Sequence, residues 1–73
     1  MESAEADKPV TFGQRLRAAR RNANLTQAQL AEKVGGDAGR INRLETRNTD
    51  PKLSTIKKLA EALGVKPADL IGE

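Results

Sequence analysis

The sequence contains no cysteine, histidine, tyrosine or tryptophan, and only one phenylalanine. The lack of cysteine excludes a disulfide framework, and the joint lack of cysteine and histidine excludes zinc and iron–sulfur sites of the usual kind. Most side chains used for acid–base or nucleophilic catalysis are also missing. The acidic residues are scattered, whereas metal-assisted hydrolysis requires a cluster of them. We therefore expect a chain that is not an enzyme and that holds no metal and no cofactor.

Long apolar runs are absent as well. No stretch approaches the roughly 20 apolar residues that a membrane-spanning helix needs, and the N-terminus lacks the apolar core of a signal peptide. With 73 residues the chain forms one domain at most. We expect a soluble intracellular protein without a membrane partner, and the missing cysteines fit a reducing compartment.

The charges are distributed unevenly along the chain. Residues 1–10 carry a net charge of −2, and residues 53–73 balance at zero. Residues 11–52 hold nine Lys and Arg side chains against four acids, a net charge of +5. A positive field on this part of the chain suits a polyanionic partner. The alternative is that these cations only keep the surface soluble.

The start of the chain predicts a tail followed by a helix. Residues 1–10 are acidic and lack apolar periodicity, so we expect a flexible tail there and one folded domain over residues 11–73. Thr11 is a suitable helix cap. Apolar residues then follow at three- and four-residue steps, which predicts one buried stripe. That stripe consists of Phe12, Leu16, Ala19 and Ala23.

A second helix is predicted to begin after Thr26, because Gln29 completes a capping box with it. Gly35 occupies the usual position for ending that helix. Between them lies a face of small residues that would let another helix approach closely. This predicted face consists of Ala28, Ala31 and Val34.

A third helix is expected over residues 37–46, with Asp37 as its cap. Ile41 and Leu44 are its only large apolar residues, so its buried stripe is narrow and its remaining face polar. Two helices joined by about three residues cross steeply, which is helix-turn-helix geometry, with the second helix projecting. Further helices are expected over residues 53–63 and 67–71. The fold class is thus all-α, a compact five-helix bundle.

The sequence resembles a known family over residues 12–71. The first matching block runs from Leu25 to Ala31 (LTQAQLA), the second from Ile41 to Glu45 (INRLE), and the third from Leu59 to Val65 (LAEALGV). These blocks resemble the phage-repressor (Cro/C1, or XRE-type) helix-turn-helix domains. The resemblance implies a lambda-repressor-like bundle that binds double-stranded DNA in the cytoplasm, in association with the nucleoid. It also implies transcriptional regulation and a possible homodimer on a two-fold operator.

The resemblance assigns roles to the residues that match. Gln27 occupies the position that binds a phosphate and braces the projecting helix, where the helix N-terminus also favours an anion. Arg20 and Glu45 match an ion pair that ties the first helix to the end of the third. Arg43 matches a base-contacting position, and arginine can bind both N7 and O6 of guanine. Asn42 lies beside it; for both, a solvated helix face is the alternative.

The sequence departs from the family at the start of the third helix. The first two positions are commonly long polar residues, whereas here they are Ala38 and Gly39. One explanation is a close approach in which Ala38 meets a thymine methyl, while Arg40, Arg43 and DNA shape supply specificity. The other is that the domain contacts few bases and binds DNA loosely, or that it binds a protein partner instead. We favour the first.

A second departure follows the third helix, where Arg47 replaces the usual glycine. Either Arg47 or Asn48 would have to adopt the left-handed conformation, which asparagine does more readily. Arg47, Asn48 and Lys52 are candidate phosphate contacts, and ordinary solvated loop residues are the alternative. The complete set of expected DNA-binding residues is Gln27, Ala38, Gly39, Arg40, Asn42, Arg43, Arg47, Asn48 and Lys52.

The sequence therefore favours sequence-specific DNA binding by a transcriptional regulator, either a repressor or a controller protein. The alternative is a protein-interaction or antitoxin-like module on the same fold, with weak or secondary DNA binding. For pairing of two chains the sequence offers only Leu70 and Ile71 near the C-terminus. Those residues either form a small apolar patch or seal the core, and sealing is the expected role of Leu70.

Overall fold

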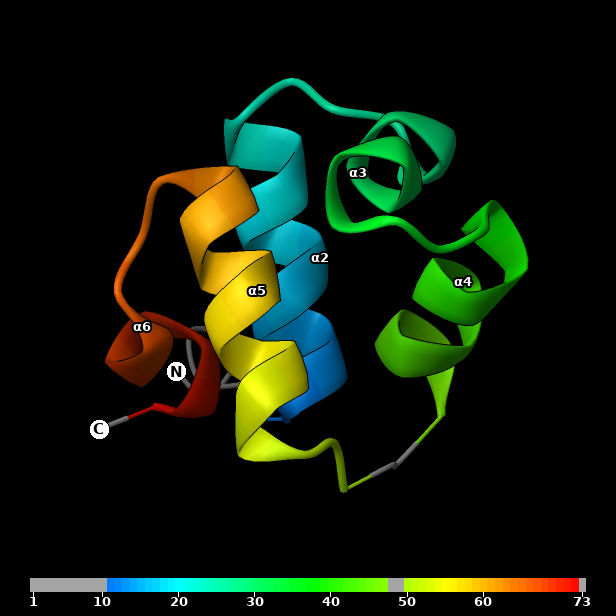
Figure 1. The fold of residues 1–73 in the computed structure, drawn as a ribbon. Coiled ribbons are helices and arrows are strands. Elements are labelled where there is room, and N and C mark those ends of the chain that lie inside the picture. The colour runs from blue at the N-terminus through cyan, green and yellow to red at the C-terminus, as the bar shows by residue number, and fades with distance from the viewer. Residues whose placement is uncertain (1–10, 48–49, 73) are drawn as a thin grey trace, which may run out of the picture.

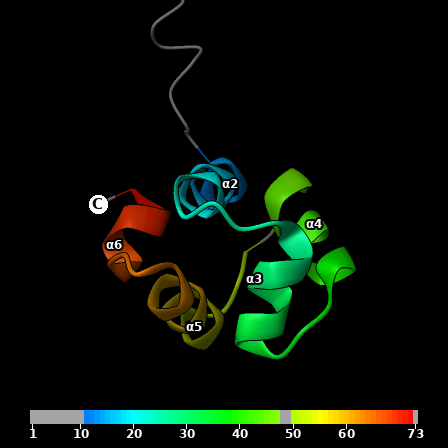
Figure 2. The ribbon, with the colours of Figure 1, turned by 90° about the horizontal axis from the view of Figure 1, so that it is seen from above.

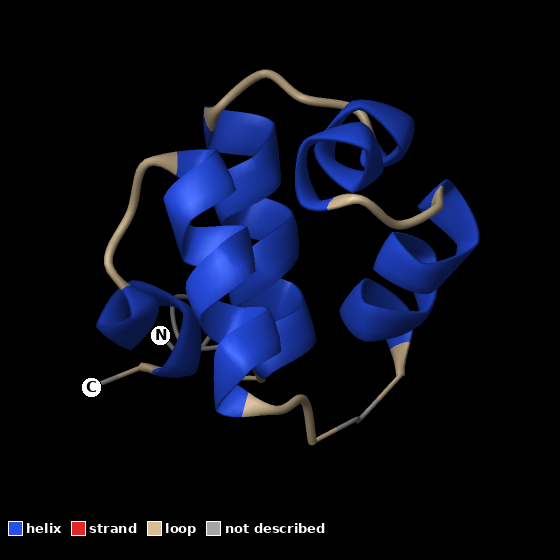
Figure 3. Cartoon of the chain, viewed as in Figure 1, coloured by secondary structure: helices blue, strands red, loops and turns tan. Residues whose placement is uncertain are grey.

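The computed structural model describes residues 11–47 and 50–72, and these form five α-helices and no strand (Figures 1 and 3). The expected tail over residues 1–10 lies outside the described residues. The bundle predicted from the sequence is confirmed. The helices are α2 (Phe12–Asn22), α3 (Gln27–Val34), α4 (Ala38–Thr46), α5 (Leu53–Leu63) and α6 (Pro67–Ile71).

The first three helices begin where the predicted caps stand. The Thr26 hydroxyl accepts a hydrogen bond from the Gln29 amide at 3.0 Å, and the Gln29 side chain accepts from the Thr26 amide at 2.8 Å. Thr11 forms an equivalent capping box with Gln14. At α4 the Asp37 carboxylate accepts from the Arg40 amide at 2.8 Å. Each cap satisfies helix N–H groups that would otherwise lack an acceptor.

A three-residue turn separates α3 from α4. Gly35 ends α3 with φ +80°, a left-handed conformation that glycine adopts without steric cost. The cap of α4 follows only two residues later, at Asp37. With so short a turn the two helices cannot fold back antiparallel, so α4 projects from the bundle.

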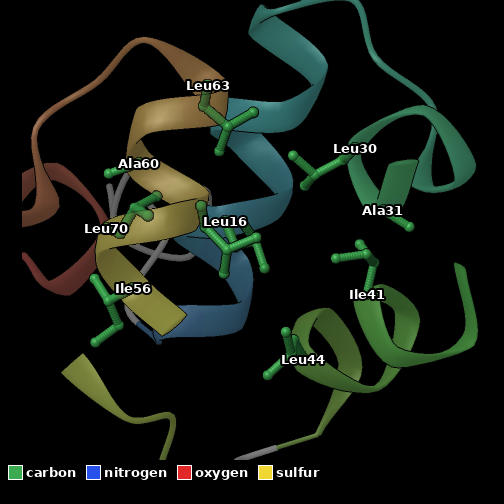
Figure 4. Close-up of a cluster of buried hydrophobic side chains, with 10 residues drawn as sticks. Leu16, Leu30, Ala31, Ile41, Leu44, Ile56, Ala60, Leu63 and Leu70 are labelled. Carbon is green, nitrogen blue, oxygen red and sulfur yellow. The ribbon is translucent and has the colours of Figure 1, made fainter. Parts of the chain in front are cut away.

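Every described helix contributes one fully buried leucine or isoleucine to the core. Burial of an apolar side chain of this size stabilises the fold by about 1.5–3 kcal/mol. Figure 4 shows that most of these side chains converge between the helices. The five residues are Leu16, Leu30, Ile41, Leu59 and Leu70. Leu70 thus seals the core as expected, whereas the neighbouring Ile71 is 42% exposed.

The small-residue face predicted for α3 is only partly correct. Ala31 is buried and Val34 is half-buried, but Ala28 is exposed. The inward stripe of α3 runs through positions 27, 30, 31 and 34, the spacing of one helix face. Ala28 lies beside that stripe, at the free N-terminal end of the helix.

The helices α2 and α5 run roughly parallel, and α3 crosses them steeply, so that it is seen end-on in Figure 1 and from the side in Figure 2. Both views place α4 at one edge of the bundle and α6 at the opposite edge. The helix α4 packs against α2 and α3, and α6 packs against α2 and α5. None of the described helices is long and apolar enough to cross a membrane.

Candidate nucleic-acid interface

The helix α4 has one buried side and one cationic exposed side. Ile41, Leu44 and Glu45 are buried against the bundle. Ala38 is half-buried, and the outward positions are all exposed. These positions are Gly39, Arg40, Asn42, Arg43, Thr46 and, at the C-cap, Arg47. The two expected apolar anchors therefore hold α4 from behind. The helix lies at one edge of the bundle in Figures 1 and 2, and its arginines are exposed.

A buried ion pair fixes the C-terminal half of α4 to α2. The Arg20 Nε lies 2.6 Å from Glu45 Oε2, and Arg20 Nη2 donates to Glu45 Oε1 at 3.1 Å. A third donor of Arg20, Nη1, bonds the carbonyl of Leu25 at 2.7 Å, in the loop before α3. The ion pair that the resemblance implied is thus present, and it is bidentate. One guanidinium connects α2, the loop after it and α4.

Gln27 joins the same network from the first position of α3. Its Nε2 donates to Glu45 Oε1 at 3.1 Å, so the side chain braces α4. An amide nitrogen carries two hydrogens, which leaves one hydrogen and the carbonyl oxygen available to a ligand. The α3 cap bonds the Gln29 amide, and the backbone N–H groups of Gln27 and Ala28 have no acceptor inside the helix. A small anion can be held there.

Charge compensation leaves the outer surface of α4 positive. Glu45 is the single acidic residue within α4, and Arg20 neutralises it in the interior. The Asp37 carboxylate is exposed at the N-cap and is directed at the helix amide of Arg40. The exposed side chains of Arg40, Arg43 and Arg47 therefore set the sign of the field on this face.

The loop after α4 contains the remaining predicted contacts. Arg47 is exposed and extended, with φ −103° and ψ 150°, so it does not adopt the left-handed conformation. Asn48, the other candidate for that conformation and a predicted phosphate contact, lies outside the described residues. Lys52 is exposed and is the N-cap of α5. Arg47 and Lys52 thus stand at the two ends of the connection from α4 to α5.

Sequence reasoning missed Gly13, which allows α2 to lie directly against α4. A β-carbon at Gly13 would stand 2.5 Å from the carbonyl oxygen of Glu45 and 2.7 Å from that of Leu44. These distances are too short for any side chain, and the opposing atoms belong to backbone that cannot swing away. The signal was a glycine inside a helical pattern, where it costs about 1 kcal/mol unless packing requires it.

Comparison with known proteins agrees with this geometry. The sequence family described as a helix-turn-helix domain matches residues 11–71. The chain belongs to this family. This helix-turn-helix domain is 39% identical over 64 residues to the immunity repressor protein of Bacillus phage phi105, covering 88% of the chain and 44% of that protein. It is 48% identical over 56 residues to the transcriptional repressor RghR of Bacillus subtilis, covering 75% of the chain and 42% of that protein.

The helix-turn-helix domain thus spans less than half the length of these curated relatives. Solved structures match it more fully. The restriction-modification controller protein C.AhdI of Aeromonas hydrophila has a TM-score of 0.78 and 39% identity, over 85% of this chain and 90% of that one. The P22 c2 repressor, crystallised with a synthetic operator, has a TM-score of 0.75 and 31% identity, over 84% and 92%. The resemblance to phage repressors is confirmed, and these regulators agree with the expectation that the chain is not an enzyme.

Replacing Gly13 by alanine should destabilise the domain. Overpacking costs about 1–3 kcal/mol, and the better helix propensity of alanine returns about 1 kcal/mol, so we expect a net loss of up to about 2 kcal/mol. Urea denaturation followed by circular dichroism measures this loss. Gly36→Ala is the control, because Gly36 is exposed and its β-carbon would meet only the Arg40 Cδ, at 3.9 Å. Equal stability of the two variants would contradict the close contact of α2 with α4.

Removing the Glu45 carboxylate should lower the stability of the domain strongly. The variant Glu45→Ala leaves the Arg20 guanidinium buried without its counter-charge, which costs about 3–5 kcal/mol in comparable pairs. The double variant Arg20→Met/Glu45→Met should recover most of that loss, since two apolar side chains of similar length need no compensation. Thermal and urea unfolding measure both variants. The exposed Glu32 provides the control, and a Glu45→Ala effect no larger than that of Glu32→Ala would refute the buried pair.

Proposed function

We propose that the domain binds double-stranded DNA in a sequence-specific manner, with α4 in the major groove, and that it acts as a transcriptional regulator, either a repressor or a controller. The observation that carries the proposal is the two-sided character of α4, with buried anchors behind and arginines in front. A helix of this width fits the major groove of B-DNA. The repressors and the controller protein among its relatives support the same assignment.

The interface divides into base contacts and phosphate contacts. We assign base contacts to Arg40, Asn42 and Arg43, which occupy the exposed face of α4. Ala38 and Gly39 carry little or no side chain, which permits close approach of the helix to the base edges. Ala38 is the candidate for apolar contact with a thymine methyl.

Phosphate contacts are assigned to the periphery of α4. Gln27 binds a phosphate together with the free amides at the start of α3, since its side chain is already held by Glu45. Contacts with the DNA phosphates on the other side of α4 are assigned to Arg47 and Lys52, and to Asn48, which lies between them in the sequence. These contacts position the helix and carry no sequence information.

A homodimer on a two-fold operator is part of the same proposal. Helix-turn-helix dimers bind half-sites about one helical turn apart, which doubles the contact area of a small domain. Two large apolar side chains are exposed among the described residues, Leu53 at 57% and Ile71 at 42%. They stand at the start of α5 and the end of α6, outside α4, and are the candidates for pairing.

Salt dependence tests the function most simply. If each subunit neutralises about four to six phosphates, the logarithm of the affinity should fall with the logarithm of salt concentration at about −0.9 per contact. Selection from random duplexes first supplies a site, and fluorescence anisotropy at several salt concentrations then measures the slope. Failure to enrich any motif, together with negligible duplex affinity at low salt, would contradict the proposal and favour a protein-interaction module.

Two substitutions separate base contacts from phosphate contacts. Arg43→Ala should cost about 1–3 kcal/mol on the selected site and relax specificity at one base pair, because it removes a bidentate contact. Gln27→Ala should weaken binding to all sequences alike, because a phosphate contact is independent of sequence. Arg17→Ala, which removes an exposed arginine of α2 outside the proposed interface, is the control. If Arg43→Ala weakened every sequence equally, Arg43 would be a phosphate contact.

A further inference from the structure

The side chain of Arg43 lies back over the first turn of its own helix. A β-carbon built on Gly39 would stand 3.5 Å from Nη1 of Arg43 and 3.2 Å from Oδ1 of Asp37. The guanidinium is therefore in ordinary van der Waals contact with that β-carbon position, and it borders the space that a longer side chain at position 39 would enter. Gly39 and Arg43 are both exposed, so this placement is on the outer face of α4.

Helix geometry explains why Arg43 takes this direction. Residues four apart share one helix face, and long helical side chains point toward the N-terminus and cover the preceding turn. Glu45, the acid within α4, is already paired with Arg20 and does not draw Arg43 toward the C-terminus. The Asp37 carboxylate, which caps the helix, lies beside the same point, 3.2 Å from the built β-carbon.

We propose that Gly39 is a positioning residue for base recognition, because its missing side chain lets the Arg43 guanidinium take the place of a long polar residue at the second position of α4. This inference rests on the proposed DNA-binding function. Four helical residues correspond to about 6 Å of rise, and stacked base pairs are about 3.4 Å apart. Arg43 therefore serves the base pair that faces the first turn of α4, and not the one that faces its own α-carbon.

The two small residues at the start of α4 thus have different consequences. Ala38 is half-buried, whereas Gly39 leaves open the space that the Arg43 guanidinium borders. The loss of a polar side chain at position 39 does not remove recognition from the first turn, because a guanidinium from the next turn supplies it. We therefore expect a preference for guanine at the base pair that faces the first turn of α4, since arginine can bind N7 and O6 together.

The test is the substitution Gly39→Val, which places two γ-carbons in the space beside the Arg43 guanidinium. The full chain, Gly39→Val, Arg43→Ala and the double variant are titrated with the selected duplex and with duplexes altered at each base pair. Gly36→Val is the matched control, because a β-carbon at this exposed glycine would meet only the Arg40 Cδ, at the ordinary contact distance of 3.9 Å. Circular dichroism melting checks the folding of every variant. Gly39→Leu, which adds a γ-carbon and is a better helix former, replaces Gly39→Val if that variant unfolds.

The full chain and Gly36→Val should prefer guanine at one base pair by about 5- to 150-fold, the range of a bidentate arginine contact. Both Gly39→Val and Arg43→Ala should lose that preference, and the double variant should lose no more than either. A Gly39→Val variant that keeps the guanine preference lost in Arg43→Ala would overturn this inference and leave the proposed function intact. Absence of any base preference in the full chain would overturn both.

Discussion

The carboxylate of Glu45 lies in the interior of a very small domain, where an uncompensated charge cannot remain. Arg20 meets it with two donors and Gln27 with a third. Each partner comes from a different helix, so the charge can be satisfied only when α2, α3 and α4 stand in one arrangement. A buried pair adds little net stability compared with apolar packing. Its contribution here is geometric, because it sets the position of α4 relative to the rest of the bundle.

Close packing at Gly13 acts together with this network. The ion pair holds the C-terminal half of α4 from one side, and the backbone contact with Gly13 sets how near α2 and α4 lie. Ile41 and Leu44 complete the attachment through the core. Because its inner face is held at these points, the outer face of α4 does not need to pack against the rest of the protein. Groove binding requires side chains that are held in a fixed position. A rigid helix with an exposed cationic face provides this, and a flexible loop does not.

The positions of the helices followed from local chemistry that the sequence displays. Helix ends are marked through caps and a left-handed turn by Thr26 with Gln29, by Asp37 and by Gly35, and the structure places the ends there. The core residues followed from apolar spacing in the same way. Ala28 was misplaced because it lies just beside the inward stripe of α3, where a small residue gives no sign of its orientation.

The site was only partly accessible from the sequence. The polar outer face of α4 followed from its narrow apolar stripe, whereas the role of Arg43 and the Arg20–Glu45 pair followed from family resemblance. Contacts that depend on the separation of two helices did not follow. The approach of Gly13 to the carbonyls of α4 joins residues 32 positions apart, at 13 and 45, and no local pattern encodes that distance. The placement of Arg43 over Gly39 likewise required coordinates, because arginine has many rotamers on an exposed helix.

Methylation protection on the selected duplex tests the central claim, that the fixed α4 presents its arginines to the major groove. Dimethyl sulfate modifies guanine N7 in the major groove and adenine N3 in the minor groove, which are groups on opposite sides of the base pair. We expect the domain to protect guanine N7 within the site and Arg43→Ala to remove the protection at one guanine. Protection confined to adenine N3, or guanine protection that is unchanged in Arg43→Ala, would contradict it.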